Sequence, residues 1–311
     1  MIIKIIDKIG MVTGQSLRFF GIHKIFYRLN GMTHKLSAQG IESFTFSATN
    51  SNFNSDKIAD CIKKNGIAII TDYINPDLMK RSSVEMEGLV NKLLPKMQFG
   101  DFGNTDGFFW QKSGKKLLGY AEKARYPIPV IDVRNKDRND IDGGMIDFFK
   151  IDEVINSNNL TASSECINML SSRKISEIIK NILGADYVND THLYYNDSVT
   201  NTRKPHCDNY ENTNKIFIYL TDVNDLDDGP YCFVPGSYLL GKYLKREQFL
   251  NRYFGYHWGD NNSMQEKYFI KCLGKAGTII ISNQSGVHYG YPQKEGRKRI
   301  AFISACAKST I

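Results

Sequence analysis

The residues best suited to chemistry lie in the C-terminal half of the chain, where a His-x-Asp sequence places His206 two residues before Asp208. On an extended strand, side chains two residues apart point to the same face, so this imidazole and this carboxylate would project together. Another histidine, His288, follows an apolar run further along. Two histidines and one carboxylate form the facial arrangement that holds non-haem Fe(II) with open coordination positions. A single His-x-Asp also occurs in solvated turns, so both interpretations stand at this point.

Basic residues follow His288 at the start of another predicted strand, where Arg297 and Arg299 precede an apolar run at 300–303. A guanidinium that points inward from this strand would hold a dicarboxylate through two parallel hydrogen bonds, for which arginine is better shaped than lysine. Both arginines are candidates for this role.

Together these segments resemble the phytanoyl-CoA dioxygenase family of Fe(II)- and 2-oxoglutarate-dependent oxygenases. The matching pieces follow the family's order and spacing: His206-Cys207-Asp208, residues 228–237, residues 276–288 and Arg299. The resemblance implies that His206, Asp208 and His288 bind iron. It also implies that Arg299, rather than Arg297, binds the distal carboxylate of 2-oxoglutarate, because Arg299 lies at the family's distance from the last histidine.

The resemblance also names residues before and after the triad. His192 stands where relatives often have glutamine, and Tyr194 shares its predicted strand, so both are candidates to contact the cosubstrate. A hydrogen-bonded core histidine is an equal interpretation of His192. The family often has a serine two residues after the last histidine, whereas this chain has Gly290. Another hydroxyl, that of Tyr291 or Tyr194, would have to replace it.

The activity that the resemblance implies is oxidation by Fe(II), 2-oxoglutarate and O2, with release of succinate and CO2. Because Asp208 completes the triad, hydroxylation of an unactivated C–H bond is expected rather than halogenation. The expected substrate is a small molecule or a glycan or lipid intermediate. The alternative is a catalytically inactive, or 2-oxoglutarate-independent, jelly-roll protein that binds a metal or a ligand.

The elements that must position these residues are short strands separated by turns, at 191–195, 216–221, 231–234, 277–282 and 299–305. Such spacing predicts an antiparallel sandwich or jelly roll. Helices are predicted at 55–64, 79–93 and 172–183, with a strand at 67–71 between the first two. The resemblance implies a mainly β fold with flanking α-helices, a double-stranded β-helix of the cupin-like jelly-roll type with N-terminal and packing helices.

Two further segments are distinguished by composition. Residues 1–55 form a basic, apolar leader with helical spacing, and residues 56–311 form the oxygenase domain. Within that domain, residues 95–160 are rich in glycine, aspartate and aromatic residues and are expected to form a lid-like insertion. Its least regular part is 100–116, where glycines would permit hinge conformations and aromatic side chains would supply an apolar inner face.

The bulk properties limit the class of protein. The formal charge of +7, from 40 basic and 33 acidic residues, is spread along the chain without a long basic block, which argues against nucleic acid as a partner. The six cysteines contain no Cys-x-x-Cys pair and no transmembrane run is found, so a cytoplasmic protein with reduced thiols is expected. The basic residues of 1–36 are compatible with peripheral contact with an anionic membrane, although an N-terminal helix packed on the core is the preferred interpretation.

Overall fold

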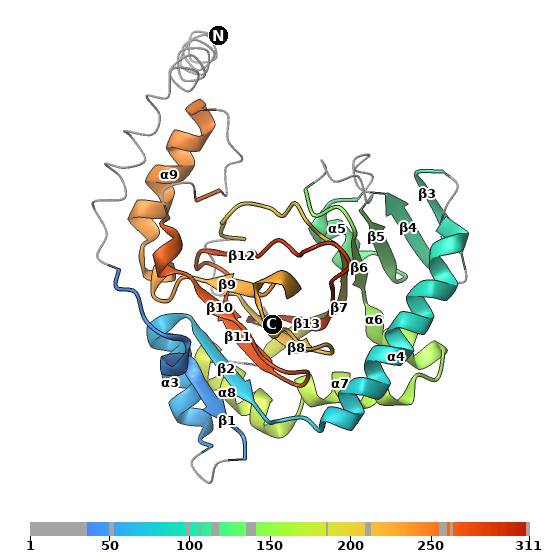
Figure 1. Cartoon of the computed structure of the whole chain (residues 1–311), viewed down its shortest axis with the longest axis horizontal. Coiled ribbons are helices and arrows are strands. Elements are labelled where there is room, and N and C mark those ends of the chain that lie inside the picture. The colour runs from blue at the N-terminus through green and yellow to red at the C-terminus, as the bar shows by residue number, and fades with distance from the viewer. Residues whose placement is uncertain are drawn as a thin grey trace.

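The computed structural model of the chain describes residues 36–49, 53–97, 100–105, 107–112, 118–134, 141–184, 186–208, 213–254, 260–261 and 264–308 (Figure 1). The strands are β1 (Thr45–Ser47), β2 (Ile67–Thr71), β3 (Phe102–Thr105), β4 (Phe108–Lys112), β5 (Val130–Val133), β6 (Met145–Phe149), β7 (Tyr187–Asp197), β8 (Asn214–Tyr219), β9 (Tyr231–Phe233), β10 (Ile270–Cys272), β11 (Ile279–Asn283), β12 (His288–Gly290) and β13 (Lys298–Lys308). The helices are α3 (Ser55–Asn65), α4 (Pro76–Leu93), α5 (Tyr120–Arg125), α6 (Ile151–Ser157), α7 (Thr161–Leu170), α8 (Arg173–Leu183) and α9 (Gly241–Phe254).

Two sheets form the framework. The large sheet has the strand order β1-β2-β11-β8-β13-β7-β6-β5-β4-β3, and the small sheet has the order β10-β9-β12. Strands that are far apart in sequence pair antiparallel at the centre of the large sheet, where β13 lies between β7 and β8 and β11 lies between β8 and β2. This arrangement is the expected jelly roll with flanking helices, so the predicted fold class is confirmed.

Apolar residues from both sheets pack in the space between them. Ile280 of β11 and Ile303 of β13 belong to the same buried cluster as Phe233 of β9 and Ile270 of β10. Alternation along β13 explains this, because Ala301 and Ile303 face this cluster whereas Ile300 and Phe302 face the helices. The central strands are therefore apolar on both faces.

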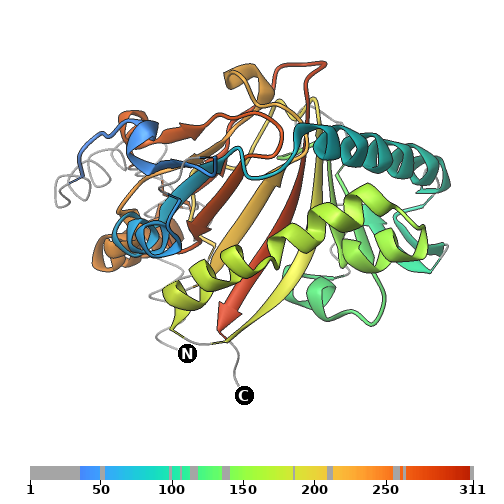
Figure 2. The ribbon, with the colours of Figure 1, turned by 90° about the horizontal axis from the view of Figure 1, so that it is seen from below.

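Helices cover the outer face of the large sheet, as Figure 2 shows for the helices that run across its strands. Helix α3 begins at the cap Asn54, whose side chain accepts hydrogen bonds from the backbone N–H groups of residues 56 and 57. It ends at Gly66, which has a φ of 79° that glycine adopts without strain. Its buried residues Ile58 and Ile62 lie one turn apart and face the sheet. The helices predicted at 55–64, 79–93 and 172–183 are confirmed, with ends that differ by a few residues at most.

The expectation of an irregular segment at 100–116 is corrected by the structure. Strands β3 and β4 pair antiparallel and, together with β5 and β6, extend the large sheet beyond β7. Phe108 and Trp110 pack in the main core, and Phe109 packs beside Val130. All three side chains are therefore buried, with at most 8% of their surface exposed. Their backbone hydrogen bonds and apolar packing stabilise strands that glycine-rich composition alone does not suggest. Closure of this region over the site stays a prediction.

The end of the expected leader also belongs to the folded domain. Strand β1 pairs in parallel with β2, and Phe44, just before it, is fully buried. The chain therefore packs on the core before residue 55, and the division into a leader and an oxygenase domain stays a prediction. Residues 1–35, on which the helical and membrane-contact expectations depend, lie outside the described residues. Among the residues that are described, no helix is long and apolar enough to cross a membrane.

Candidate metal centre and its cavity

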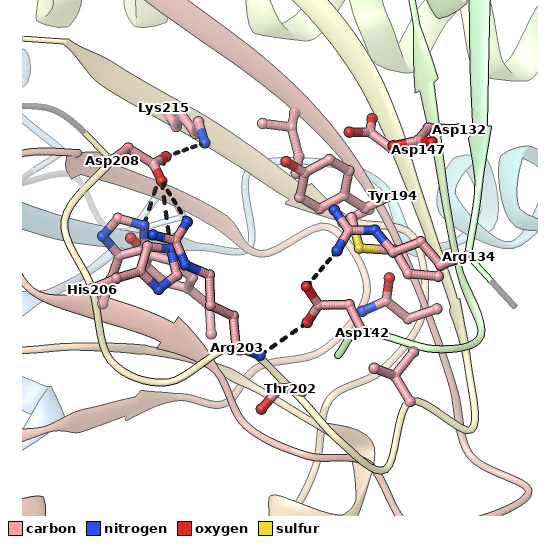
Figure 3. Close-up of a pocket in the computed structure, with 18 of the residues that line it drawn as sticks. Asp132, Arg134, Asp142, Asp147, Tyr194, Thr202, Arg203, His206, Asp208 and Lys215 are labelled. Atoms are coloured by element: carbon pink, nitrogen blue, oxygen red, sulfur yellow. Dashed lines mark hydrogen bonds and ion pairs between the residues drawn. The ribbon is translucent and has the colours of Figure 1, made fainter. Parts of the chain in front are cut away.

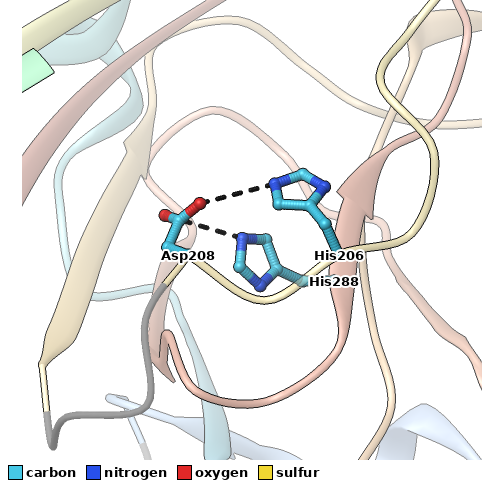
Figure 4. A group of neighbouring side chains, drawn as sticks. All are labelled: His206, Asp208 and His288. Carbon is cyan, nitrogen blue, oxygen red and sulfur yellow. Dashed lines mark ion pairs between the residues drawn. The ribbon is translucent and has the colours of Figure 1, made fainter. Parts of the chain in front are cut away.

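The side chains of His206, Asp208 and His288 come together in the folded chain (Figure 4). His288 is the first residue of β12, and His206 forms an isolated antiparallel bridge with it through reciprocal backbone hydrogen bonds of 2.9 Å. The expectation that His206 and Asp208 lie within a strand is corrected, since Asp208 follows the bridge in a bend. Their side chains nevertheless converge, because the bridge places both imidazoles beside the carboxylate.

The ring nitrogens of both histidines are oriented by backbone carbonyl groups. Nδ1 of His206 lies 2.7 Å from the carbonyl oxygen of Lys204, and Nδ1 of His288 lies 2.9 Å from that of Gly286. A carbonyl oxygen only accepts, so each Nδ1 donates and each Nε2 is directed elsewhere. The Nε2 atoms lie 3.4 Å (His206) and 3.8 Å (His288) from the two carboxylate oxygens of Asp208.

Charges around Asp208 keep it ionised. Lys215 Nζ lies 2.6 Å from Asp208 Oδ2, and Arg203 Nη1 lies 4.0 Å from Oδ1. Burial by itself would raise the pKa of Asp208, but Lys215 and the two histidines hold it well below its ordinary value. Burial lowers the pKa of His288 to about 3, so this imidazole is neutral near pH 7 and has a lone pair to donate.

This donor set fits a divalent iron ion. Among the described residues, one group of three His, Cys, Asp or Glu side chains could hold a metal, and its ligand atoms all lie within 4.8 Å of one another. The two imidazoles each present Nε2, and their Nδ1–H groups are held by the hydrogen bonds that metal-bound histidines normally make. The chemistry of two histidines and one carboxylate matches that of non-haem Fe(II) sites.

A cavity of about 920 Å³ opens beside this group, and Figure 3 shows part of its wall. It is lined by His206, Asp208 and His288, and also by Arg299 from β13. The volume is within the range of pockets that bind small molecules.

The structure separates the two candidate arginines. Arg299 lines the cavity and donates a hydrogen bond from Nη1 to the carbonyl oxygen of Gly229, and burial lowers the pKa of its guanidinium. Arg297 does not line it; its side chain is 47% exposed and lies 3.3 Å from Asp228 and 3.8 Å from Asp225. Residues two positions apart on a strand would point to the same face, so alternation does not explain why only Arg299 enters the cavity. Arg297 precedes β13, which begins at Lys298, and its side chain is therefore not held on the cavity face of the strand.

Gly290 lies beside Arg299. A Cβ atom added at Gly290 would meet Nη2 of Arg299 at 3.7 Å, an ordinary contact, so the missing side chain leaves space next to the guanidinium. Gly290 and Tyr194 line the cavity, whereas Tyr291 does not. Tyr194 is therefore the better placed of the two hydroxyls that were expected to replace a serine.

His192 lies behind the cavity wall. It is 1% exposed, with Nδ1 3.2 Å from Asp147 and Nε2 3.0 Å from Asp190. Burial by itself would lower its pKa, but the hydrogen bonds to both carboxylates raise it to about 9. His192 does not line the cavity, so its position agrees with the hydrogen-bonded core interpretation, and its contact with a cosubstrate stays a prediction.

Sequence reasoning missed polar residues that line the cavity from the extended part of the sheet. Gln111, Asp132 and Asp147 lie on β4, β5 and β6, and Lys215 lies on β8 beside the triad. The sequence did contain a signal for these residues, namely a single polar residue within a short apolar run. Examples are the aspartates of Val130–Val133 and Met145–Phe149. In a strand this pattern marks a polar position on a buried face.

Comparison with solved structures finds matches at low sequence identity. The non-heme alpha ketoglutarate dependent epimerase SnoN from nogalamycin biosynthesis is 12% identical, with a TM-score of 0.47, and the match covers 82% of this chain and 83% of that chain. The carbocyclase SnoK from the same biosynthesis is 13% identical, with a TM-score of 0.46 and coverage of 88% and 87%. EctD from S. alaskensis, solved with 2-oxoglutarate and 5-hydroxyectoine, is 13% identical, with a TM-score of 0.46 and coverage of 83% and 78%.

No curated protein matches the chain. The family model described as phytanoyl-CoA dioxygenase (PhyH) matches residues 62–301, a range that contains the triad, Arg299 and most of the large sheet. The chain therefore belongs to the phytanoyl-CoA dioxygenase family of Fe(II)- and 2-oxoglutarate-dependent oxygenases, which use O2.

Proposed function

We propose that this oxygenase hydroxylates an unactivated C–H bond of a small molecule, with iron held by His206, Asp208 and His288 and 2-oxoglutarate held by Arg299. The observation that carries the proposal is the convergence of these residues on one cavity, with both Nε2 atoms directed to the carboxylate and the buried guanidinium in the same wall. Bound iron and 2-oxoglutarate would supply an oxidant strong enough for such a bond, with succinate and CO2 as by-products.

The residues of the chain then have separate tasks. The carbonyl groups of Lys204 and Gly286 keep both imidazoles in the orientation that leaves Nε2 available. Lys215 holds one oxygen of Asp208, which leaves the other for the metal. Because Arg299 is buried, its charge is weakly screened, which favours pairing with a carboxylate that enters the cavity.

The bounded volume of the cavity and the buried carboxylates in its wall support a small molecule over a long acyl chain. A lipid tail would place hydrocarbon against these carboxylates, which is costly. A glycan or a polar headgroup intermediate remains compatible with the wall. Asp208 supports hydroxylation, since it occupies the position that a halide would need.

The proposal is tested by mixing the protein with Fe(II) and 2-oxoglutarate without O2. Wild-type protein should develop the weak visible charge-transfer band of the chelated complex, and His206→Ala should lose it. His192→Gln is the matched control: it removes another buried histidine that does not line the cavity and should retain the band. No band in the wild type, or an unchanged band in His206→Ala, would contradict the ligand assignment. Screening small molecules for succinate formation coupled to a hydroxylated product then tests the reaction.

A further inference from the structure

The turn 141–144, which leads into β6, contacts the segment that precedes the metal ligands. Asp142 of this turn lines the cavity, and so do Arg134, Thr202 and Arg203. Figure 3 shows Asp142 between Arg134 and Arg203, with an interaction drawn to each of them. The extended part of the sheet is therefore joined to the metal-binding segment through one carboxylate.

Asp142 uses both of its carboxylate oxygens and its backbone N–H group in these contacts. Oδ1 accepts the backbone N–H of Arg203 at 3.1 Å, and Oδ2 accepts Nη1 of Arg134 at 2.6 Å. The backbone N–H of Asp142 donates to the carbonyl oxygen of Asn201 at 2.6 Å. Asp142 thus holds the backbone of residues 201–203 at two points.

The turn that carries Asp142 is itself fixed to the sheet. Asp142 has a φ of 58°, in the left-handed region where aspartate and asparagine are more frequent than other non-glycine residues. Gly144 lies so close to β7 that an added Cβ atom would meet the carbonyl oxygen of Asp197 at 2.4 Å. The backbone N–H of Asp197 donates to the carbonyl oxygen of Gly144 at 3.2 Å. A side chain on this turn can therefore serve as a support for a neighbouring segment.

The segment that Asp142 supports has no strand pairing of its own. All residues between β7 and His206 are described, and none of them belongs to a strand. Val199, near the start, donates its N–H to Oε1 of Gln293 at 3.0 Å, and His206, at the end, is held by its bridge to His288. The hydrogen bonds from Asp142 hold the backbone between these two anchors.

This backbone orients the metal ligands. The carbonyl oxygen of Lys204 lies 2.7 Å from Nδ1 of His206, and Nη1 of Arg203 lies 4.0 Å from Oδ1 of Asp208. The residue whose N–H is held by Asp142 directly precedes the residue whose carbonyl group holds the imidazole. Because an outer hydrogen bond fixes the ring orientation of a metal-binding histidine, a shift of this segment would move Nε2 of His206 away from its position.

We propose that Asp142 is a positioning residue of the metal centre, which holds residues 201–203 so that the Lys204 carbonyl group keeps His206 oriented for the metal. It acts through the backbone and does not bind the metal itself. The turn before β6 and the metal ligands are thereby coupled. This inference rests on the proposed function, because it takes the triad to bind iron.

The test measures binding of Co(II) alone by calorimetry, without 2-oxoglutarate or turnover. Asp142→Gly removes the carboxylate without backbone strain, since glycine adopts a positive φ readily. It should raise the Kd for Co(II) about tenfold, the usual scale for the loss of an outer support of a metal ligand. Asp142→Asn should stay within about threefold of the wild type, because the amide oxygen still accepts the N–H of Arg203 and asparagine tolerates this φ.

Asp72→Gly is the matched control. Asp72 also has a φ of 58°, and its carboxylate accepts hydrogen bonds from the hydroxyl groups of Ser47 and Thr71, but it does not line the cavity. The Kd for Co(II) should stay within about twofold in this variant. The comparison separates an effect on the metal ligands from the general effect of replacing a left-handed aspartate by glycine.

A second measurement needs no metal. Amide hydrogen exchange at Arg203 should be at least about tenfold faster in metal-free Asp142→Gly than in the wild type, because its N–H group loses an ionised acceptor. Exchange in the central strands β8 and β13 should be unchanged. If Asp142→Gly does not fold, as judged by circular dichroism, Arg134→Met replaces it in the Co(II) titration. This variant removes the partner of Oδ2 and should raise the Kd several-fold.

A Kd in Asp142→Gly that is no weaker than in Asp72→Gly would overturn the proposal, as would an unchanged Kd in Arg134→Met where that variant is used. Equal loss of affinity in Asp142→Asn and Asp142→Gly would also overturn it, because the charge rather than the hydrogen bond would then be responsible. The anaerobic band with Fe(II) and 2-oxoglutarate is recorded for the wild type. A wild type that binds Co(II) and develops the band, with Asp142→Gly equal to it, rejects the positioning role alone. A wild type with neither property rejects the proposed function.

Discussion

Replacement of Arg299 by leucine should weaken 2-oxoglutarate binding strongly and leave metal binding unchanged. The side chain lines the cavity, is buried and lies beside the space left by Gly290, so a carboxylate that enters there would meet a weakly screened guanidinium. A hydrogen bond to a charged group contributes ~1.5–3 kcal/mol, which corresponds to a rise in Kd of about 10- to 150-fold. The hydrogen bonds and ion pairs of His206, Asp208 and His288 in the described part of the chain involve Lys204, Gly286, Lys215 and one another rather than Arg299, so the affinity for the metal should be retained.

Arg297→Leu is the matched variant, since it removes the same side chain two residues earlier. Arg297 is 47% exposed and pairs with the exposed Asp225 and the buried Asp228, which also accepts backbone hydrogen bonds from Asn224 and Asp225. Its loss should leave the Kd of 2-oxoglutarate within about twofold and lower stability by about 1 kcal/mol. The Kd is measured by anaerobic titration of the visible band, and urea unfolding verifies that both variants fold. Arg299→Lys should lie between the wild type and Arg299→Leu. A larger effect from Arg297→Leu, or an unchanged Kd in Arg299→Leu, would refute the assignment of the carboxylate partner.

Two other predictions concern the cavity wall. Because the pKa of His192 is raised from 6.5 to about 9 by Asp147 and Asp190, its protonation stabilises the fold fully below pH 6.5, and this contribution is lost as the pH rises through 9. Urea unfolding should show that the wild type loses roughly 3 kcal/mol more stability across this window than His192→Gln does, and parallel curves would contradict the charged pairing. Gly290→Ser should tighten 2-oxoglutarate binding about two- to tenfold in the same anaerobic titration, because its hydroxyl would enter the space beside Arg299. A weaker affinity would mean that the space is needed by the cosubstrate itself.

The sequence alone determined the class of fold and the residues of the candidate centre. Local signals were sufficient for the apolar strands and for α3, where a capping asparagine and a terminal glycine mark both ends. The triad could be named because its chemistry requires particular residue types, and because the segments around His206 and His288 resemble the family in order and spacing. Helix caps, residue types and the order of motifs are all properties of short stretches of sequence, so they can be identified without the tertiary structure.

Tertiary structure decided which face each residue occupies. Residues 100–116 were expected to be irregular, since their glycines and aromatic residues have no clear period. They contain β3 and β4, which join the large sheet through β5 and β6 to β7. Arg297 and Arg299 were indistinguishable by residue type, and only the start of β13 places one in the cavity and the other at the surface. Asp132 and Asp147 lie in different apolar runs, and their meeting across two strands depends on a register that no local pattern specifies. This polar wall of the cavity could therefore not be predicted from the sequence, because it is built from single residues on strands that only the folded sheet brings side by side.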